Sequence, residues 1–60
     1  MRVTITFTCD GAAFDEPATE IARILREIAK RAERGDDAPA PGLSILDWNG
    51  NRVGQWVITH

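Results

Sequence analysis

Hydrophobic and polar residues alternate strictly over residues 3–9. The odd-numbered positions are apolar, and the even-numbered positions are all threonine. This period-two pattern, rich in β-branched residues, is typical of a half-buried strand. We therefore predict a strand over 3–9, followed at Asp10-Gly11 by a connection over 10–15.

The apolar period changes to three and four residues over 17–34, which indicates a helix with one apolar face. Pro17 suits its first turn, Asp15 or Glu16 can cap it, and Gly35 suits the position after its end. The apolar stripe consists of Ile21, Ile24, Leu25, Ile28 and Ala32.

A loop over 35–42 leads to two further alternating segments, over 43–48 and 52–58. They flank Asn49-Gly50, which is the strongest short signal for a β-hairpin with a two-residue type I′ turn. The sequence therefore predicts two antiparallel strands joined at this dipeptide.

A two-residue turn fixes the pairing of this hairpin, because it places Leu43 opposite Trp56 and Trp48 opposite Asn51. The alternation then divides the side chains between two faces. The expected core face carries Leu43, Ile45, Trp56 and Ile58, and the other face carries Ser44, Leu46, Trp48, Val53, Gln55 and Val57.

The order of elements, β-α-β-β, predicts one α+β domain over 1–60, with one helix on a three-stranded antiparallel sheet. Sheet order 1-3-2 is favoured because it makes every pair antiparallel. The alternative order, 3-2-1, needs a parallel pair with a right-handed crossover. The expected core is Val3, Ile5, Phe7, Ile21, Leu25, Ile28, Leu43, Ile45, Trp56 and Ile58.

The length and composition of the chain argue against several classes of function. The chain has 60 residues, a formal charge of −2, one Cys and one His. Neither an internal disulfide nor a four-ligand zinc site is available to such a chain, and its core is marginal. Domains of this size need an economical core or a partner subunit, and they lack room for a deep substrate cleft. We expect no enzyme, no cofactor and no bound metal.

The hydropathy pattern gives an expectation for the cellular location of the protein. Apolar runs reach only three residues, so no membrane span is expected, and the alternating start lacks a signal-peptide core. Together with the unpaired Cys9, this predicts a cytoplasmic protein. A net charge near zero gives no general attraction to nucleic acid.

Acidic residues concentrate outside the predicted helix, and they form one candidate partner-binding surface. The alternative is that they only cap the helix and hold water. An acidic rim of this kind would suit a basic surface of a partner. These residues are Asp10, Asp15, Glu16, Asp36, Asp37 and Asp47.

A basic helix face offers a second candidate surface, for nucleic acid. This interpretation is weaker because single-strand binding usually adds several stacking aromatic residues on an open sheet. The alternative is an ordinary solvated face. The residues are Arg23, Arg26, Lys30, Arg31 and Arg34.

The sheet face that the helix leaves open is the third candidate. A contiguous apolar patch with a tryptophan suggests an interface, although interspersed polar residues could also leave it as plain surface. A second copy is the simplest partner, either by sheet packing or by pairing of edge strands. The candidate residues are Leu46, Trp48, Val53, Gln55 and Val57.

Three segments resemble a group of short proteins encoded in bacteriophages and prophages. They are the stretch from Phe7 to Phe14, the helix EIARILREIAKR and the hairpin LDWNGNRVGQW. The resemblance implies a phage context and a bacterial host cytoplasm. Most members of this group have no assigned function, so the resemblance implies a context more than an activity. By analogy with other small, acidic, non-enzymatic phage proteins, such as anti-CRISPR inhibitors, we expect a protein that binds a host protein complex stoichiometrically. A structural homodimer without a host target is the alternative.

Overall fold

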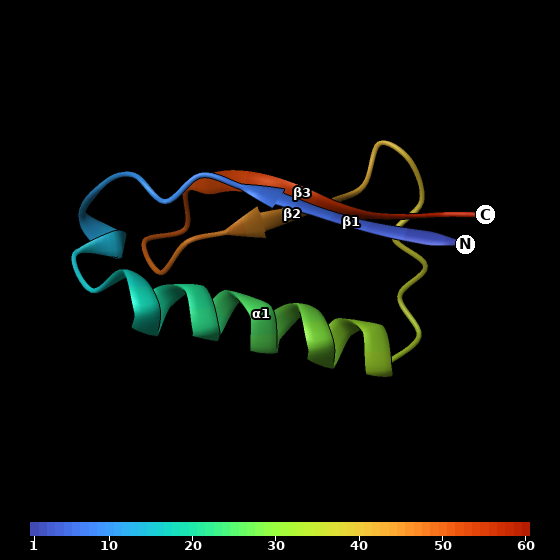
Figure 1. Ribbon diagram of the computed structural model, residues 1–60, viewed down its shortest axis with the longest axis horizontal. Coiled ribbons are helices and arrows are strands. Elements are labelled where there is room, and N and C mark those ends of the chain that lie inside the picture. The colour runs from blue at the N-terminus through green and yellow to red at the C-terminus, as the bar shows by residue number, and fades with distance from the viewer.

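A three-stranded antiparallel sheet carries a single helix on one of its faces (Figure 1). The computed structural model describes all 60 residues. The elements follow the predicted β-α-β-β order, with one short 3-10 helix added: β1 (Arg2–Phe7), η1 (Ala12–Phe14), α1 (Pro17–Glu33), β2 (Leu43–Leu46) and β3 (Arg52–Thr59).

The strand order is β1-β3-β2, so the favoured sheet order is confirmed. The β1–β3 register runs from Arg2 opposite Thr59 to Phe7 opposite Gly54. The two ends of the chain therefore lie side by side (Figure 1). β1 ends two residues earlier than predicted, and Cys9 is exposed rather than part of the core face.

At Gly54, β3 lies close against the backbone of β1. A Cβ atom at this position would collide with the carbonyl oxygen of Thr6 and with Cα and Cβ of Phe7. Only glycine allows two backbones to come so near each other in a sheet. The central strand is therefore fixed against β1 at this point by the absence of a side chain.

The hairpin turn differs from the predicted type I′ turn. The backbone N–H of Gly50 donates to the carbonyl of Asp47 at 3.0 Å, and the N–H of Asp47 donates to the carbonyl of Asn51 at 2.9 Å. The loop therefore contains three residues, Trp48, Asn49 and Gly50. Only Gly50 has a positive φ, 84°. A tight turn followed by a left-handed glycine is the common geometry for a three-residue hairpin loop.

A β-bulge compensates for the longer loop. Leu46 faces Arg52, whereas Ile45 faces Gly54, so Val53 is an extra residue on β3. The bulge restores the predicted pairing of Leu43 with Trp56. The predicted pair of Trp48 and Asn51 is wrong because Trp48 lies in the loop, but the pairing at the other end of the hairpin is correct.

The ends of α1 are formed by backbone groups. Glu16 occupies the N-cap position without a side-chain hydrogen bond, so capping by Asp15 or Glu16 is not observed. At the other end, the Gly35 N–H donates to Ala32 and the Asp36 N–H donates to Arg31. These two bonds form a Schellman motif, which ends the helix where the sequence predicts.

The core lies between α1 and the β2–β3 half of the sheet. Trp56 and Ile24 are the largest fully buried side chains. Three buried core residues are not among the expected ones. Phe14 and Ala38 lie outside the predicted elements, and Ile24 belongs to the predicted apolar stripe but not to the expected core. The buried core consists of Phe14, Ile24, Ile28, Ala38, Ile45 and Trp56, with Phe7, Ile21, Leu43 and Ile58 partly buried against it.

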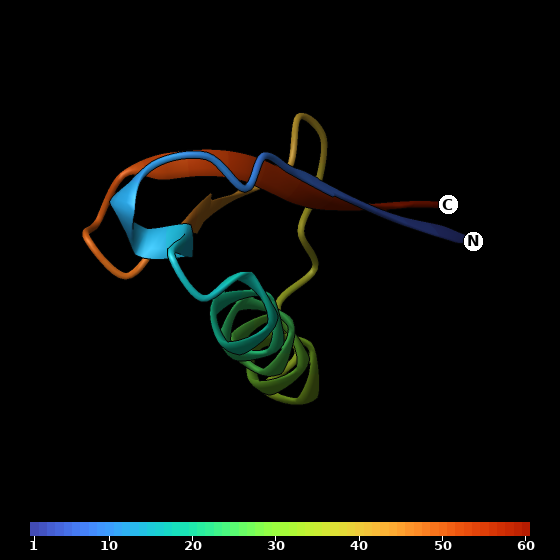
Figure 2. The same cartoon turned by 60° about the vertical axis from the view of Figure 1, so that its left-hand side comes forward.

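Three expected core residues are substantially exposed: Val3 by 53%, Ile5 by 40% and Leu25 by 45%. The reason is that α1 is tied to the β2 edge. Arg23 donates to the carbonyl of Leu46 and Arg31 to that of Ser44. Because the helix is held at the β2 edge, α1 leaves β1 largely uncovered. Figure 2 looks nearly along the axis of α1 and shows the helix beneath the sheet.

None of the helices could cross a membrane, since each is too short or too polar.

Candidate functional site

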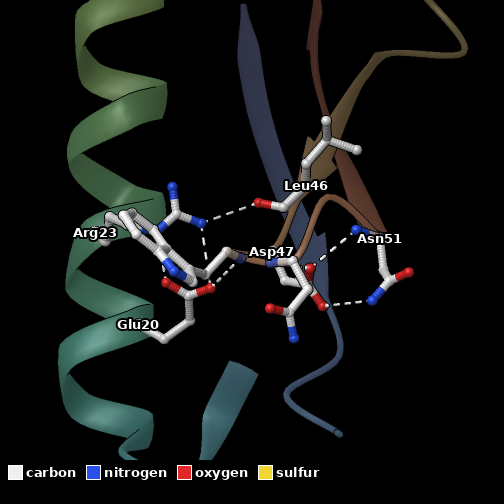
Figure 3. Close-up of polar contacts among 7 residues, drawn as sticks. Glu20, Arg23, Leu46, Asp47 and Asn51 are labelled. Carbon is white, nitrogen blue, oxygen red and sulfur yellow. Dashed lines mark hydrogen bonds and ion pairs between the residues drawn. The ribbon is translucent and has the colours of Figure 1, made fainter. Parts of the chain in front are cut away.

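The hairpin turn is held from within by the carboxylate of Asp47, which is buried (Figure 3). Its Oδ1 atom accepts the backbone N–H groups of Asn49 and Asn51, each at 2.9 Å. Its Oδ2 atom accepts the side-chain amide of Asn51 at 3.4 Å. An aspartate that bonds backbone groups ahead of it stabilises a turn locally. Asp47 therefore has a structural role in the turn.

The turn is also held from outside by Glu20, a carboxylate on α1 that is only 5% exposed. Its Oε2 atom accepts the backbone N–H of Trp48 at 2.6 Å. Its Oε1 atom pairs with Nε of Arg23, and Nη2 of Arg23 also donates to the carbonyl of Leu46 at 3.1 Å (Figure 3). Two side chains of α1 thus fix the turn to the helix through charge-assisted hydrogen bonds.

The hydrogen bond from Arg23 lowers the pKa of Glu20 below its ordinary value, and the N–H of Trp48 lowers it further. Burial acts in the opposite direction but does not outweigh these contacts. Glu20 is therefore ionised at neutral pH, which is the state in which both of its oxygens accept.

Sequence reasoning did not single out Glu20. Its position contains a signal, because Glu20 lies four residues before Ile24 and so falls on the buried stripe of the helix. A charged residue on such a stripe needs a partner, and Arg23 is within reach three residues on. The contact to Trp48 could not be foreseen, since it depends on how the hairpin lies against α1.

Trp48 is the most prominent side chain of this site. Its side chain is 75% exposed, and the guanidinium carbon of Arg23 lies 5.6 Å from the centre of its ring. A shallow groove runs beside it between the turn and the first turns of α1, bounded by Glu16, Thr19 and Arg26. The prediction that Trp48 lies on the open sheet face is wrong, because the three-residue loop places it beside the helix.

The acidic residues do not form one surface. Asp10, Asp15 and Glu16 lie before α1, whereas Asp36 and Asp37 follow it. A helix of 17 residues separates these groups by about 25 Å. Asp36 also pairs with Arg34 at 3.1 Å and with Arg31 at 3.4 Å, and the bond from Arg34 is the main cause of its lowered pKa.

The basic helix face is partly neutralised. Arg23 is paired with Glu20, and Arg31 and Arg34 are paired with Asp36. Arg31 also lies over the buried ring of Trp56, 5.8 Å from its centre. Arg26 and Lys30 are the two members of the predicted surface that are exposed and form no ion pair. The face therefore offers much less free positive charge than its sequence suggests.

The open sheet face, on the side of the sheet away from α1, is more polar than predicted. Val53 packs against the core, while Leu46, Gln55 and Val57 keep their predicted places. Arg52 lies across this face, donating from Nε to Ser44 Oγ at 3.2 Å and from Nη2 to Gln55 Oε1 at 3.3 Å. An arginine in this position separates the apolar residues, so they form no continuous patch.

No group of three or more His, Cys, Asp or Glu side chains is arranged to hold a metal ion. Comparison of the chain with protein-family models, curated proteins and solved structures finds no match.

Proposed function

We propose that this chain is a non-enzymatic protein-binding module whose main contact is Trp48 and the groove beside it. The observation that carries the proposal is an exposed indole on a turn that buried charges fix in place. Binding loses less conformational entropy when the contacting group is already ordered. Tryptophan and arginine are also enriched among the residues that dominate protein interfaces.

The charge around Trp48 favours a protein over a nucleic acid as partner. The nearest arginine, Arg23, is neutralised by Glu20, and the groove beside the ring carries both Glu16 and Arg26. Binding to phosphates needs several free cations, because counterion release supplies most of the affinity. A mixed rim around an aromatic residue is the pattern of a protein interface.

The sequence resemblance to phage-encoded proteins supports a narrower form of this proposal. In that setting the partner is a host protein complex in the bacterial cytoplasm, and the module inhibits it by occupying a surface stoichiometrically. An anti-CRISPR role belongs to this class. It rests on the resemblance and not on the geometry of the turn.

The test is a binding measurement with three versions of the chain. The wild type would first be used to isolate a partner from a bacterial host, and the purified partner would then be titrated calorimetrically. We expect equimolar binding, and we expect Trp48→Ala to weaken it by about 30-fold or more, the effect of a hot-spot residue. Asp37→Lys is the matched control because Asp37 is exposed and lies beyond the far end of α1.

Retention of full affinity by Trp48→Ala would refute this site. If Asp37→Lys abolished binding instead, the acidic residues after α1 would be the contact. Circular dichroism of each variant shows whether the fold is intact, and the 75% exposure of Trp48 predicts that it is.

A further inference from the structure

The outer edge of β1 has unpaired backbone groups. The N–H of Thr8 donates to the carbonyl of Val53 on β3 at 3.0 Å. This bond shows which residues of β1 direct their backbone groups towards β3 and which direct them outward. In an antiparallel pair the bonded residues alternate, so Thr6, Thr4 and Arg2 also direct their backbone groups towards β3. The N–H and C=O groups of Val3, Ile5 and Phe7 consequently point outward, away from the sheet.

The same residues carry apolar side chains on the helix side of the sheet. Val3 and Ile5 are exposed because α1 does not reach beneath them. Leu25 lies two residues after Arg23, about 200° around the helix, so it projects towards the β1 side. Val3 and Ile5 on β1 and Leu25 on the facing flank of α1 are thus apolar residues left exposed on the same side of the molecule. We call these three residues the β1 edge surface.

The opposite edge of the sheet is partly covered by side chains of α1. Arg23 and Arg31 donate to the outward carbonyls of β2, at 3.1 Å and 3.2 Å. Proteins commonly protect an edge strand by charges or by an overlying element. The β1 edge surface has neither, because residues 3–7 contain no charge, proline or bulge.

Charge and area both fit a second copy of this chain as the occupant. The absence of charge over residues 3–7 means that two identical edges do not repel each other. The chain exposes 4282 Å², about 400 Å² more than the roughly 3,900 Å² expected of a compact monomer of its mass. If each copy buried this excess, the interface would total about 800 Å², which is below the roughly 1,200 Å² of a stable specific complex, so the association we expect is weak and reversible.

We propose that two copies associate through antiparallel pairing of β1 with β1, with Ile5 facing Ile5 on the two-fold axis. This register pairs Val3 with Phe7 of the second copy, so every outward backbone group of the strand gains a partner. Thr4 then faces Thr6 on the opposite side, and threonine pairs of this kind stabilise a sheet. The result is one six-stranded sheet with both helices on the same face. The site at Trp48 is not involved.

The test is sedimentation velocity over a series from micromolar to millimolar concentration. We expect the mass to double from 6.6 kDa as the concentration rises. Ile5→Lys places two ammonium groups directly opposite each other, so it should stay monomeric at every concentration where the wild type is dimeric. Ile5→Glu should behave in the same way. An equimolar mixture of the two variants should form a heterodimer, because the opposed charges then attract.

Leu46→Lys is the matched control, since it adds the same charge at a similarly exposed position on β2. It should leave the dimer intact. A wild type that is monomeric throughout, or a dimer lost only in Leu46→Lys, would overturn the proposal.

Amide hydrogen exchange of the wild type gives a result that does not depend on a variant's folding. The N–H groups of Val3, Ile5 and Phe7 should be protected at high concentration and exchange freely on dilution. Rapid exchange of all three at every concentration would also overturn the proposal.

Discussion

The buried carboxylate of Glu20 accepts the backbone N–H of Trp48 at 2.6 Å, across 28 residues of sequence. Through this bond, α1 determines where the hairpin turn lies. The position of Trp48, the most exposed aromatic residue of the molecule, therefore depends on the buried charge of Glu20.

Removal of this carboxylate should destabilise the fold. Glu20→Ala leaves the N–H of Trp48 and the guanidinium of Arg23 without their acceptor, and we expect a loss of about 1–3 kcal/mol in the free energy of unfolding. Urea denaturation measures it. Glu27→Ala, on the same helix but exposed and unpaired, should change stability by no more than about 0.5 kcal/mol. Equal losses in both variants would contradict the role of Glu20.

Acid should weaken the fold through the same group. The pKa of Glu20 is lower in the folded chain than in the unfolded chain, so the unfolded state binds more protons as the pH falls. Its contribution is present above the ordinary glutamate pKa of about 4.3 and disappears as the pH drops through the folded value. Urea midpoints measured from neutral pH into this range should decline. The decline should be shallower in Glu20→Gln, and an unchanged slope would show that other carboxylates are responsible.

Asp47 should prove to be a turn residue. Asp47→Ala removes the acceptor of three hydrogen bonds within the turn, and we expect a loss of about 1–3 kcal/mol in stability. Asp47→Asn keeps an oxygen for the two backbone N–H groups, so its loss should be smaller. If both variants remained as stable as the wild type, the side chain would be free for another role.

Gly54 should tolerate no side chain. In Gly54→Ala the new methyl group meets the backbone of Thr6 and Phe7, and neither can move without separating β1 from β3. We expect a loss of about 1–3 kcal/mol or more, together with faster amide exchange at Thr4 and Thr6. Gly50→Ala has free space around it but keeps a positive φ, so it should cost about 1–2 kcal/mol and leave that exchange unchanged.

The two tryptophans should differ sharply in their contribution to stability. Trp56→Ala empties the centre of the core, and a loss of about 3–5 kcal/mol equals the whole stability expected of a domain this small. We expect this variant to be unfolded by circular dichroism. Trp48→Ala loses only the contact with Arg23, about 0.5–1 kcal/mol, and should melt cooperatively. A cooperative melt of Trp56→Ala close to that of the wild type would contradict the burial of Trp56 at the centre of the core.

The fold could be predicted from local patterns because those patterns agree with one another. The alternation before Cys9, the stripe through Ile24 and the paired segments around Asn49 each specify one element, and antiparallel pairing then orders the sheet. The turn was mispredicted because Asn-Gly suits two loop lengths. The choice is made by Asp47, whose carboxylate bonds the N–H groups of Asn49 and Asn51.

The candidate site was less predictable because it depends on contacts between distant segments. The sequence identifies Trp48 as a candidate binding residue, but it does not show on which side of the sheet Trp48 lies. The exposure of Val3 and Ile5 could not be predicted either, because it depends on two arginines that hold α1 near β2. Periodicity shows which face of a strand is apolar, but it does not show how far a single helix extends across the sheet.

The partial covering of the β2 edge by Arg23 and Arg31 limits assembly. A sheet with two open edges can add strands from both sides and grow into a fibre. In the proposed dimer, a strand that pairs with β1 fills the vacant side, and both outer borders of the enlarged sheet are β2 edges with two carbonyls already bonded to guanidinium groups. Growth by edge pairing beyond one addition is therefore disfavoured, and the two arginines oppose polymerisation as well as anchoring the helix.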